Sequence, residues 1–240
     1  MSIKTIAKVL LLSSLMFFQT IAYAATSAGN VTRITGQGEA QAKSADGVVR
    51  TLVKGDAIYS GDAVSTGKDT TLDIVFADKS RFSVGQQSVF VVDKFVYNRN
   101  GEGDSFHTHI LKGLFRFVSG LIAKSQSRDM TVGVSVATIG IRGTHVEGEV
   151  SERQEKDGVM VDASARVVLL APEDADQQTA IIVSNEFGSV VVDKPGYGTE
   201  IPDEKSPPSP VRKMQLHTVG NIQRAIRNSV RQSGTARPRM

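Results

Sequence analysis

The chain has 240 residues and a formal net charge of +3, a value that conceals two oppositely charged parts. Residues 25–204 contain 18 basic and 25 acidic side chains and carry −7, whereas residues 205–240 contain eight basic side chains, no acidic ones, and carry +8. The basic character therefore belongs to a tail, and we expect no nucleic-acid partner. Cysteine is absent, which excludes disulfides, a lipid-anchored cysteine, thiolate metal sites and a cysteine nucleophile.

The first 24 residues have the pattern of a secretory signal peptide. Lys4 and Lys8 flank the start of an apolar stretch, residues 9–18, and the small residues Ala22 and Ala24 fit a cleavage site. The apolar stretch is shorter than the ~20 residues that a membrane-spanning helix needs. We therefore expect cleavage near Ala24 rather than a retained anchor, and a soluble periplasmic or secreted product.

Residues 25–200 are predicted to form an all-β domain. Short extended segments punctuated by glycine and aspartate run from Val31 to Val192, without a convincing helical period. Residues 71–76 alternate cleanly, and Asp78-Lys79 predicts a turn into the strand 81–84. Later strands are expected at 88–97, 106–118, 130–150, 159–170 and 180–192. These segments predict a compact twisted sheet sandwich or a short solenoid-like β domain.

A six-residue repeat occurs near the start of this domain. Gly55-Asp56 and Gly61-Asp62 each begin a unit whose apolar anchor is Ile58 or Val64. Two copies are too few for a long hexapeptide helix, so the repeat predicts paired turns or short rungs of a coiled sheet.

The carboxyl-terminal part changes character twice. Residues 201–210 contain four prolines and are predicted to be a linker, because proline forbids helix and stiffens the chain. Residues 211–240 place apolar side chains near helical spacing and predict a basic amphipathic helix and tail. Three arginines are candidate partner contacts, with anionic lipid, an acidic protein or the chain's own acidic body as targets: Arg224, Arg227 and Arg231. We expect removal of residues 205–240 to leave thermal stability nearly intact.

The segment 136–150 places one arginine between glycines in an apolar run. Ile139 and Ile141 share one face of an extended chain, whereas Val146 and Val150 have the opposite parity, so the alternation slips between the pairs. Gly143 is the predicted bend. The neighbouring Arg142 is either exposed at a strand end for a partner or held internally by carbonyls and a carboxylate, and we expect internal pairing.

The order of these motifs resembles the periplasmic domain of the FecR family. The resemblance covers residues 51–150 and includes the glycine-aspartate units, the 72–78 and 81–84 strands, residues 114–120, and the segment Thr138-Ile-Gly-Ile-Arg-Gly-Thr144. Within it, Gly140, Arg142, Gly143 and Thr144 match the family's glycine-flanked arginine followed by threonine, a motif that we interpret as structural.

This resemblance implies an all-β sensing or interaction domain of the cell envelope. Sigma-factor regulators of the family carry a cytoplasmic region and a spanning helix before this domain, and neither is recognised here, so anti-sigma activity is not transferred. We expect a non-catalytic FecR-like domain that binds an envelope protein partner or ligand in a signalling system. The alternatives are a structural envelope or cell-surface protein and, as a minor one, a glycan hydrolase.

No catalytic, cofactor or metal site is predicted. His107 and His109 point the same way on a strand but lack an evident third ligand. His145, Glu147 and Glu149 also share one face, where two carboxylates could serve hydrolysis, although a solvated outer face is the expected explanation. No nucleophile elbow or phosphate loop occurs. Phe115 and Phe117 are expected to belong to a strand with both faces partly covered rather than to a stacking surface.

Overall fold

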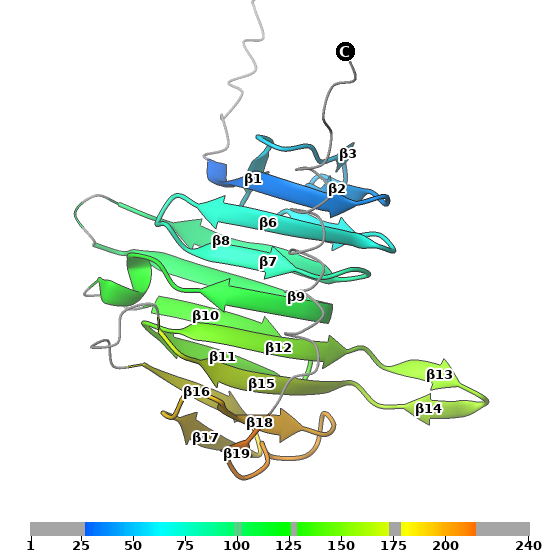
Figure 1. The fold of residues 1–240 in the computed structure, drawn as a ribbon, viewed down its shortest axis with the longest axis vertical. Helices are drawn as coiled ribbons and strands as arrows, with labels where there is room; N and C mark the ends of the chain where they lie inside the picture. The colour runs from blue at the N-terminus through cyan, green and yellow to red at the C-terminus, as the bar shows by residue number, and fades with distance from the viewer. Residues whose placement is uncertain (1–26, 99, 101, 126–128, 173–178, 215–240) are drawn as a thin grey trace, which may run out of the picture.

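A computed structural model describes residues 27–98, 100, 102–125, 129–172 and 179–214. The described residues form two stacked layers of strands, called here the front sheet and the back sheet after their positions in Figure 1; neighbouring strands are antiparallel except for the parallel pair β9–β10 in the back sheet. Within the described residues the only helix is a 3-10 turn, η1 (Ile122–Lys124). None of the described helical residues forms a segment long and apolar enough to cross a membrane. The all-β prediction is confirmed; the predicted helix falls mainly on residues 215–240, outside the described residues.

The two sheets share strand β9 (Ser105–Val118). The front sheet contains its second half together with β1 (Ser27–Gly36), β4 (Ala57–Tyr59), β6 (Thr70–Phe76), β7 (Arg81–Val84), β12 (His145–Ser151), β15 (Ser164–Leu170), β18 (Tyr197–Ile201) and β19 (Arg212–Lys213). The back sheet contains its first half together with β2 (Ala40–Lys43), β3 (Val49–Thr51), β5 (Ala63–Thr66), β8 (Val89–Val96), β10 (Asp129–Val134), β11 (Ala137–Arg142), β16 (Ala180–Asn185) and β17 (Gly188–Val192).

A glycine allows β9 to cross from one layer to the other. The strand pairs with β8 and β10 in the back sheet, and from Gly113 onward with β7 and β12 in the front sheet. Gly113 has φ +103°, and a Cβ atom there would lie 2.1 Å from Ser88 Oγ. Only glycine fits a backbone that is both left-handed and in contact with its neighbour.

The core lies between the layers and is rich in phenylalanine. Phe82 packs edge-on against Phe90 of the back sheet, with 4.8 Å between ring centroids. Phe115 and Phe117 are fully buried beside Phe82, which confirms that they are packing residues rather than a stacking surface. Such edge-to-face pairs stabilise a core beyond the area they bury.

Strand 71–76 and the turn after it are confirmed. The face of β6 that carries Leu72, Ile74 and Phe76 is buried, and Lys79 occupies the turn with φ 71°. The longer predicted strands are wrong in extent, because each contains a turn. Residues 130–150 form β10, β11 and β12, and residues 180–192 form the β16–β17 hairpin. Residues 159–170 divide between β15 and β14 (Val159–Val161), which pairs with β13 (Gln154–Lys156) in a hairpin that projects from the body (Figure 1).

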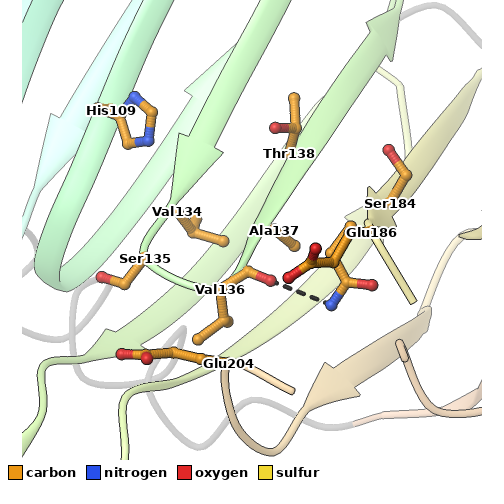
Figure 2. A pocket seen from close by; sticks show the side chains of 10 residues that line it. His109, Val134, Ser135, Val136, Ala137, Thr138, Ser184, Glu186 and Glu204 are labelled. Carbon is orange, nitrogen blue, oxygen red and sulfur yellow. Dashed lines mark hydrogen bonds between the residues drawn. The ribbon is translucent and has the colours of Figure 1, made fainter. Parts of the chain in front are cut away.

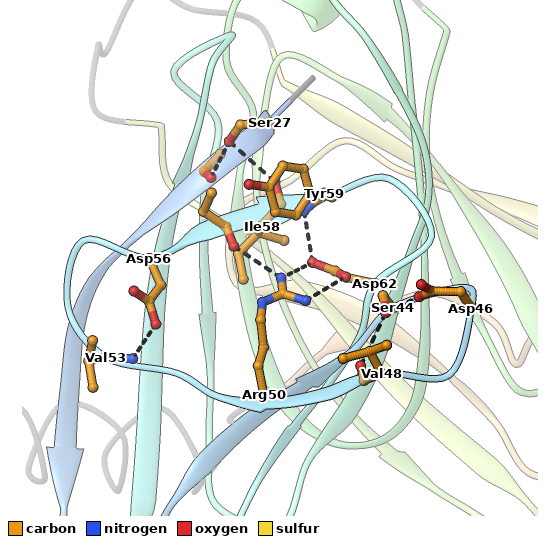
Figure 3. Close-up of polar contacts among 12 residues, drawn as sticks. Ser27, Ser44, Asp46, Val48, Arg50, Val53, Asp56, Ile58, Tyr59 and Asp62 are labelled. Carbon is orange, nitrogen blue, oxygen red and sulfur yellow. Dashed lines mark hydrogen bonds and ion pairs between the residues drawn. The ribbon is translucent and has the colours of Figure 1, made fainter. Parts of the chain in front are cut away.

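The six-residue repeat forms two equivalent turns, as Figure 3 shows. Asp56 Oδ2 accepts the N–H of Val53 at 2.8 Å, and Asp62 Oδ2 accepts that of Tyr59 at 2.8 Å, in each case from the residue three positions earlier. The glycine before each aspartate has positive φ. Both anchors, Ile58 and Val64, are fully buried, so the paired-turn prediction is confirmed.

The proline-rich segment lies against the body. The Ser209 N–H donates to the Glu200 carbonyl at 2.9 Å, the Thr199 hydroxyl donates to the Ser209 carbonyl at 2.7 Å, and Pro208 is buried. Ile201 ends β18, and the predicted helix start is wrong, because residues 212–213 form β19 instead. Proline has no backbone N–H, so this segment has few donors. Its Ser209 backbone groups nevertheless form hydrogen bonds with β18.

Candidate functional site

The glycine-flanked arginine motif marks a second crossing between the sheets. Arg142 ends β11 in the back sheet, and β12 begins at His145 in the front sheet. Gly143 lies between them with φ 53°. Ile139 and Ile141 before it and Val146 and Val150 after it are all buried. The predicted slip in alternation at Gly143 is therefore confirmed, and its cause is the passage of the chain from one layer to the other.

Arg142 is exposed, so the expectation that it is buried and internally paired is wrong. Because Ile139 and Ile141 point into the core, the alternation of the strand directs Arg142 to the outer face of the back sheet. None of the ion pairs found among the described residues includes Arg142. The guanidinium is thus presented at a strand end, next to Ala180 of β16.

Thr144 belongs to a buried corner in which motifs distant in sequence meet. Its N–H donates to Ser119 Oγ at 2.8 Å, and the Ser119 N–H donates to the Thr144 carbonyl at 3.0 Å. Gly120, the residue after Ser119, donates its N–H to Ser80 Oγ at 2.9 Å. A Cβ atom at Gly120 would lie 2.2 Å from the Asp78 carbonyl oxygen.

Asp78 completes this corner. Its carboxylate, fully buried, accepts the Ser80 N–H at 2.9 Å and the Ser80 hydroxyl at 2.7 Å. Its carbonyl accepts the Leu121 N–H at 2.7 Å. A buried carboxylate that is satisfied by hydrogen bonds in this way holds a fold together and offers nothing to a substrate.

The outer face of β12 differs from the predicted solvated surface. His145 and Glu147 point away from the core but are only 7 % and 3 % exposed, so the expectation is wrong for both; Glu149 is half-buried. Burial raises the pKa of the Glu147 carboxyl, and Arg116 lowers it to a smaller extent. Arg116 Nε lies 3.8 Å from Glu147 Oε1, an ion pair without a hydrogen bond.

The two histidines lie on the outer face of the back sheet, each beside an aspartate. The His107 ring bridges Thr131 at 2.7 Å and Asp129 at 3.0 Å, and the His109 ring lies 3.4 Å from Asp93. In the described parts of the chain, no three histidine or acidic side chains gather where a metal could bind. The ring of His109 covers Gly133, where a Cβ atom would lie 2.6 Å from Cε1.

A shallow hollow of about 310 Å³ lies beside His109 at the end of this face (Figure 2). The β10–β11 turn forms its floor, where the Asn185 amide donates to the Val136 carbonyl at 3.3 Å. Ser135, Thr138 and Glu204 contribute polar groups at its rim. The hollow is open to solvent and its lining is mixed in polarity.

Sequence reasoning missed an ion pair between a buried aspartate and a half-buried arginine. The Arg50 guanidinium holds both carboxylate oxygens of Asp62, donates to the Ala57 carbonyl at 3.1 Å, and lies 5.4 Å from the centroid of the Tyr59 ring (Figure 3). Its hydrogen bond with Asp62 raises the pKa of Arg50. The signal available in the sequence was the repeated aspartate, because a buried carboxylate in a turn is satisfied by backbone donors, a cation or both.

The comparison with known families agrees with this geometry. The family described as FecR protein matches residues 62–168, a range that contains the Asp78 corner, both sheet crossings and Arg142. No curated protein shows significant similarity to the chain. The proposed contacts Arg224, Arg227 and Arg231 lie outside both the matched range and the described residues. Residues 62–168 are therefore a FecR family domain, and they include the buried corner in which Thr144 and Ser119 exchange hydrogen bonds.

Proposed function

We propose that the chain is an exported, non-catalytic FecR-domain protein that binds an envelope protein partner in a signalling system. The family assignment supports a regulatory role. The basic and apolar character of residues 1–24 supports export to the periplasm or beyond.

The exposed position of Arg142 is the observation that carries the proposal. The motif arginine lies on the outer face of the back sheet, four residues along β11 from Thr138, which is also exposed on that face. Exposed apolar side chains occur on the same face: Leu111, Ile182 and Val191 are 43 %, 40 % and 58 % exposed. An arginine combined with apolar side chains on an open sheet is typical of a protein-binding surface.

The geometry favours binding over hydrolysis. Glu147 and Glu149 lie on the front sheet, whereas the described hollow lies on the back sheet. A glycosidase needs its two carboxyl groups on either side of a bound sugar. These two carboxylates sit side by side on one strand instead.

Photocrosslinking in envelope fractions tests this function. A photoreactive residue at Thr138 is expected to capture one envelope protein in stoichiometric amount, and Arg142→Ala is expected to reduce capture at least tenfold. Lys54→Ala is the matched control, because Lys54 is an exposed cation in the turn between β3 and β4, outside this face. Equal capture in both variants, or capture of cell-wall material alone, would contradict the proposal.

One observation favours the alternative of a structural envelope protein. Among the described residues, the end strands of the back sheet, β3 and β17, pair with a neighbour on one side only, and they contain the exposed apolar side chains Val49 and Val191. Open edges of this kind can pair with another copy. Crosslinking that yields only ladders of this chain would support that role and not the signalling one.

A further inference from the structure

Strands β13 and β14 form an arm, residues 154–161, that projects from the body and stands apart from both sheets (Figure 1). Among the described residues the two strands pair only with each other, and every residue of both is exposed. A two-stranded hairpin of this size is at best marginally stable in water by itself. A contact that adds strands to the arm would therefore stabilise it.

The two edges of the arm differ in composition. Strand β13 reads Gln154-Glu155-Lys156, and strand β14 reads Val159-Met160-Val161. The three apolar side chains of β14 are 64 %, 59 % and 42 % exposed. Charged side chains protect a sheet edge from further pairing, whereas an exposed apolar edge is a template for another strand. The edge of β14 is therefore the one suited to pairing.

The turn of the arm determines which backbone groups lie at this edge. Asp157 and Gly158 have φ of 52° and 76°, the positive values of a two-residue type I′ turn. The pair of residues that flanks such a turn is hydrogen-bonded, and the next pair directs its N–H and carbonyl groups outward. Met160 and Glu155 are that next pair, so the N–H and carbonyl of Met160 lie at the free edge of β14.

A second, antiparallel copy of β14 matches this edge. When the two-fold axis passes through Met160, the outward N–H and carbonyl of Met160 meet the same groups of the other copy. Val159 of each copy then lies opposite Val161 of the other. Cross-strand pairs of apolar side chains, β-branched ones among them, are the contacts that stabilise a sheet.

The charges favour self-pairing through β14 and oppose it through β13. In the arrangement about Met160, Asp162 of one copy faces Gly158 of the other, and the Asp162 carboxylate is already paired with Arg153 at 3.0 Å. No two acidic side chains are thus directly opposed. The equivalent arrangement of β13 would set Glu155 against Glu155, and like charges directly opposite each other destabilise a sheet.

We propose that two copies of the chain associate through β14, antiparallel about Met160, and join their arms into one four-stranded sheet. The contact is isologous, so it closes on a dimer and does not extend into a fibre. The tip of each arm lies beside the base of the other, which places the two bodies at opposite ends of the joined sheet. The outer face of the back sheet and Arg142 take no part, so this inference is independent of the partner-binding function proposed above.

Single cysteine substitutions test the pairing, because the chain has no cysteine of its own. Opposed residues of a hydrogen-bonded antiparallel pair have Cα atoms about 5.5 Å apart, a separation that a disulfide spans. In the full chain, Met160→Cys is therefore expected to form disulfide-linked dimers at least about tenfold faster than Glu155→Cys. Glu155 is the matched control: it is exposed on the same arm opposite Met160, but three strand spacings, about 14 Å, would separate it from its counterpart.

A charge substitution tests the same edge without a covalent bond. Met160→Lys sets two lysines directly opposite each other and is expected to yield monomers in sedimentation experiments at concentrations where the parent chain is dimeric. Gln154→Lys adds the same charge to the outer strand of the same arm and should leave the dimer intact. Both residues are exposed outside the core, so both variants are expected to keep the thermal transition of the body.

Four results would overturn the proposal. The first three are equal rates of crosslinking for the two cysteine variants, a parent chain that sediments as a monomer at every concentration tested, and a dimer that persists in Met160→Lys. The fourth is a monomeric parent whose photoreactive residue at position 160 captures a different envelope protein, which would assign the arm to that protein.

Discussion

The outer faces of the two sheets are built differently. The front sheet places charged residues in a row across neighbouring strands, in which Arg33 pairs with Asp73 and Arg116 lies beside Glu147. The back sheet has small residues at its centre, Gly133 and Gly140, with an exposed arginine and exposed aliphatic side chains around them.

This difference separates a face that is closed from one that is available. On the front sheet, outward-facing residues such as Glu147 and Val168 are buried. On the back sheet, the outward-facing residues Arg142, Thr138 and Ile182 are exposed. The motif arginine is thus accessible from solvent, whereas Glu147 and Val168 on the opposite side of the molecule are not.

The largest expected effect concerns the core that both faces share. A Cβ atom at Gly148 would lie 2.4 Å from the Phe115 ring, whereas one at Gly140 would meet nothing closer than 3.8 Å. Gly148→Ala is therefore expected to reduce the free energy of unfolding by about 2–3 kcal/mol through overpacking. The matched Gly140→Ala should change it by less than about 0.5 kcal/mol. Similar urea midpoints for the two variants would contradict the assignment of inner and outer faces.

The next effect separates the two parts of the carboxyl-terminal segment. Deleting residues 205–240 removes the hydrogen bonds of Ser209 and Met214 to β18 and its adjoining turn, so we expect a loss of about 2–3 kcal/mol. This replaces the expectation of nearly unchanged stability. Deleting residues 215–240 keeps those bonds and should cost less, which thermal melting of both truncations would measure. Equal losses would assign the stability to the terminal segment instead.

Burial of Glu147 makes the stability of the fold depend on pH. Burial raises the folded-state pKa of this carboxyl above its ordinary value of 4.5, so the folded state binds the proton more tightly than the unfolded state. Its stabilising contribution is complete below the unfolded pKa and is lost as the pH rises through the folded pKa. Glu147→Gln should thus be more stable than the parent chain at pH 7, by about 1 kcal/mol, but not at pH 4.

Arg116 provides the control for this titration. When Arg116 is replaced by glutamine, the advantage of Glu147→Gln at pH 7 should grow, because the cation that lowers the pKa of this carboxyl is then absent. A pH-independent difference between parent and variant would show that Glu147 is not the titrating group.

The smallest expected effect on stability belongs to Arg142. Because the side chain is exposed, Arg142→Ala should change the free energy of unfolding by less than about 0.5 kcal/mol. A loss of about 3 kcal/mol in chemical denaturation would restore the buried, paired interpretation.

Features that depend on local alternation were predictable from the sequence. The inward face of residues 71–76, the turn at Lys79 and the slip at Gly143 follow from side-chain parity and glycine geometry. The exposure of Arg142 follows from the same parity, since Ile139 and Ile141 point inward. The prediction that Arg142 is internally paired is based on its charge between two glycines. That prediction is wrong because the position on the strand, not the charge, determines which side the residue faces.

Features that depend on distant packing could not be predicted in this way. Alternation correctly places Glu147 on an outer face, but whether that face meets water depends on what covers it. The Arg50–Asp62 pair and the contact of Thr144 with Ser119 join residues brought together only by the fold. The turns at residues 135–136 and 186–187 were also not predicted, because no proline or glycine pair marks them in the sequence.

Strand β9 also links the two faces energetically. Its 14 residues pair with β8 and β10 in one layer and with β7 and β12 in the other. Neither layer can open without releasing hydrogen bonds of this strand, so the sheets are expected to unfold as one cooperative unit. A partner that binds only the back sheet would then slow amide hydrogen exchange throughout the front sheet, on the side of the molecule that it never touches.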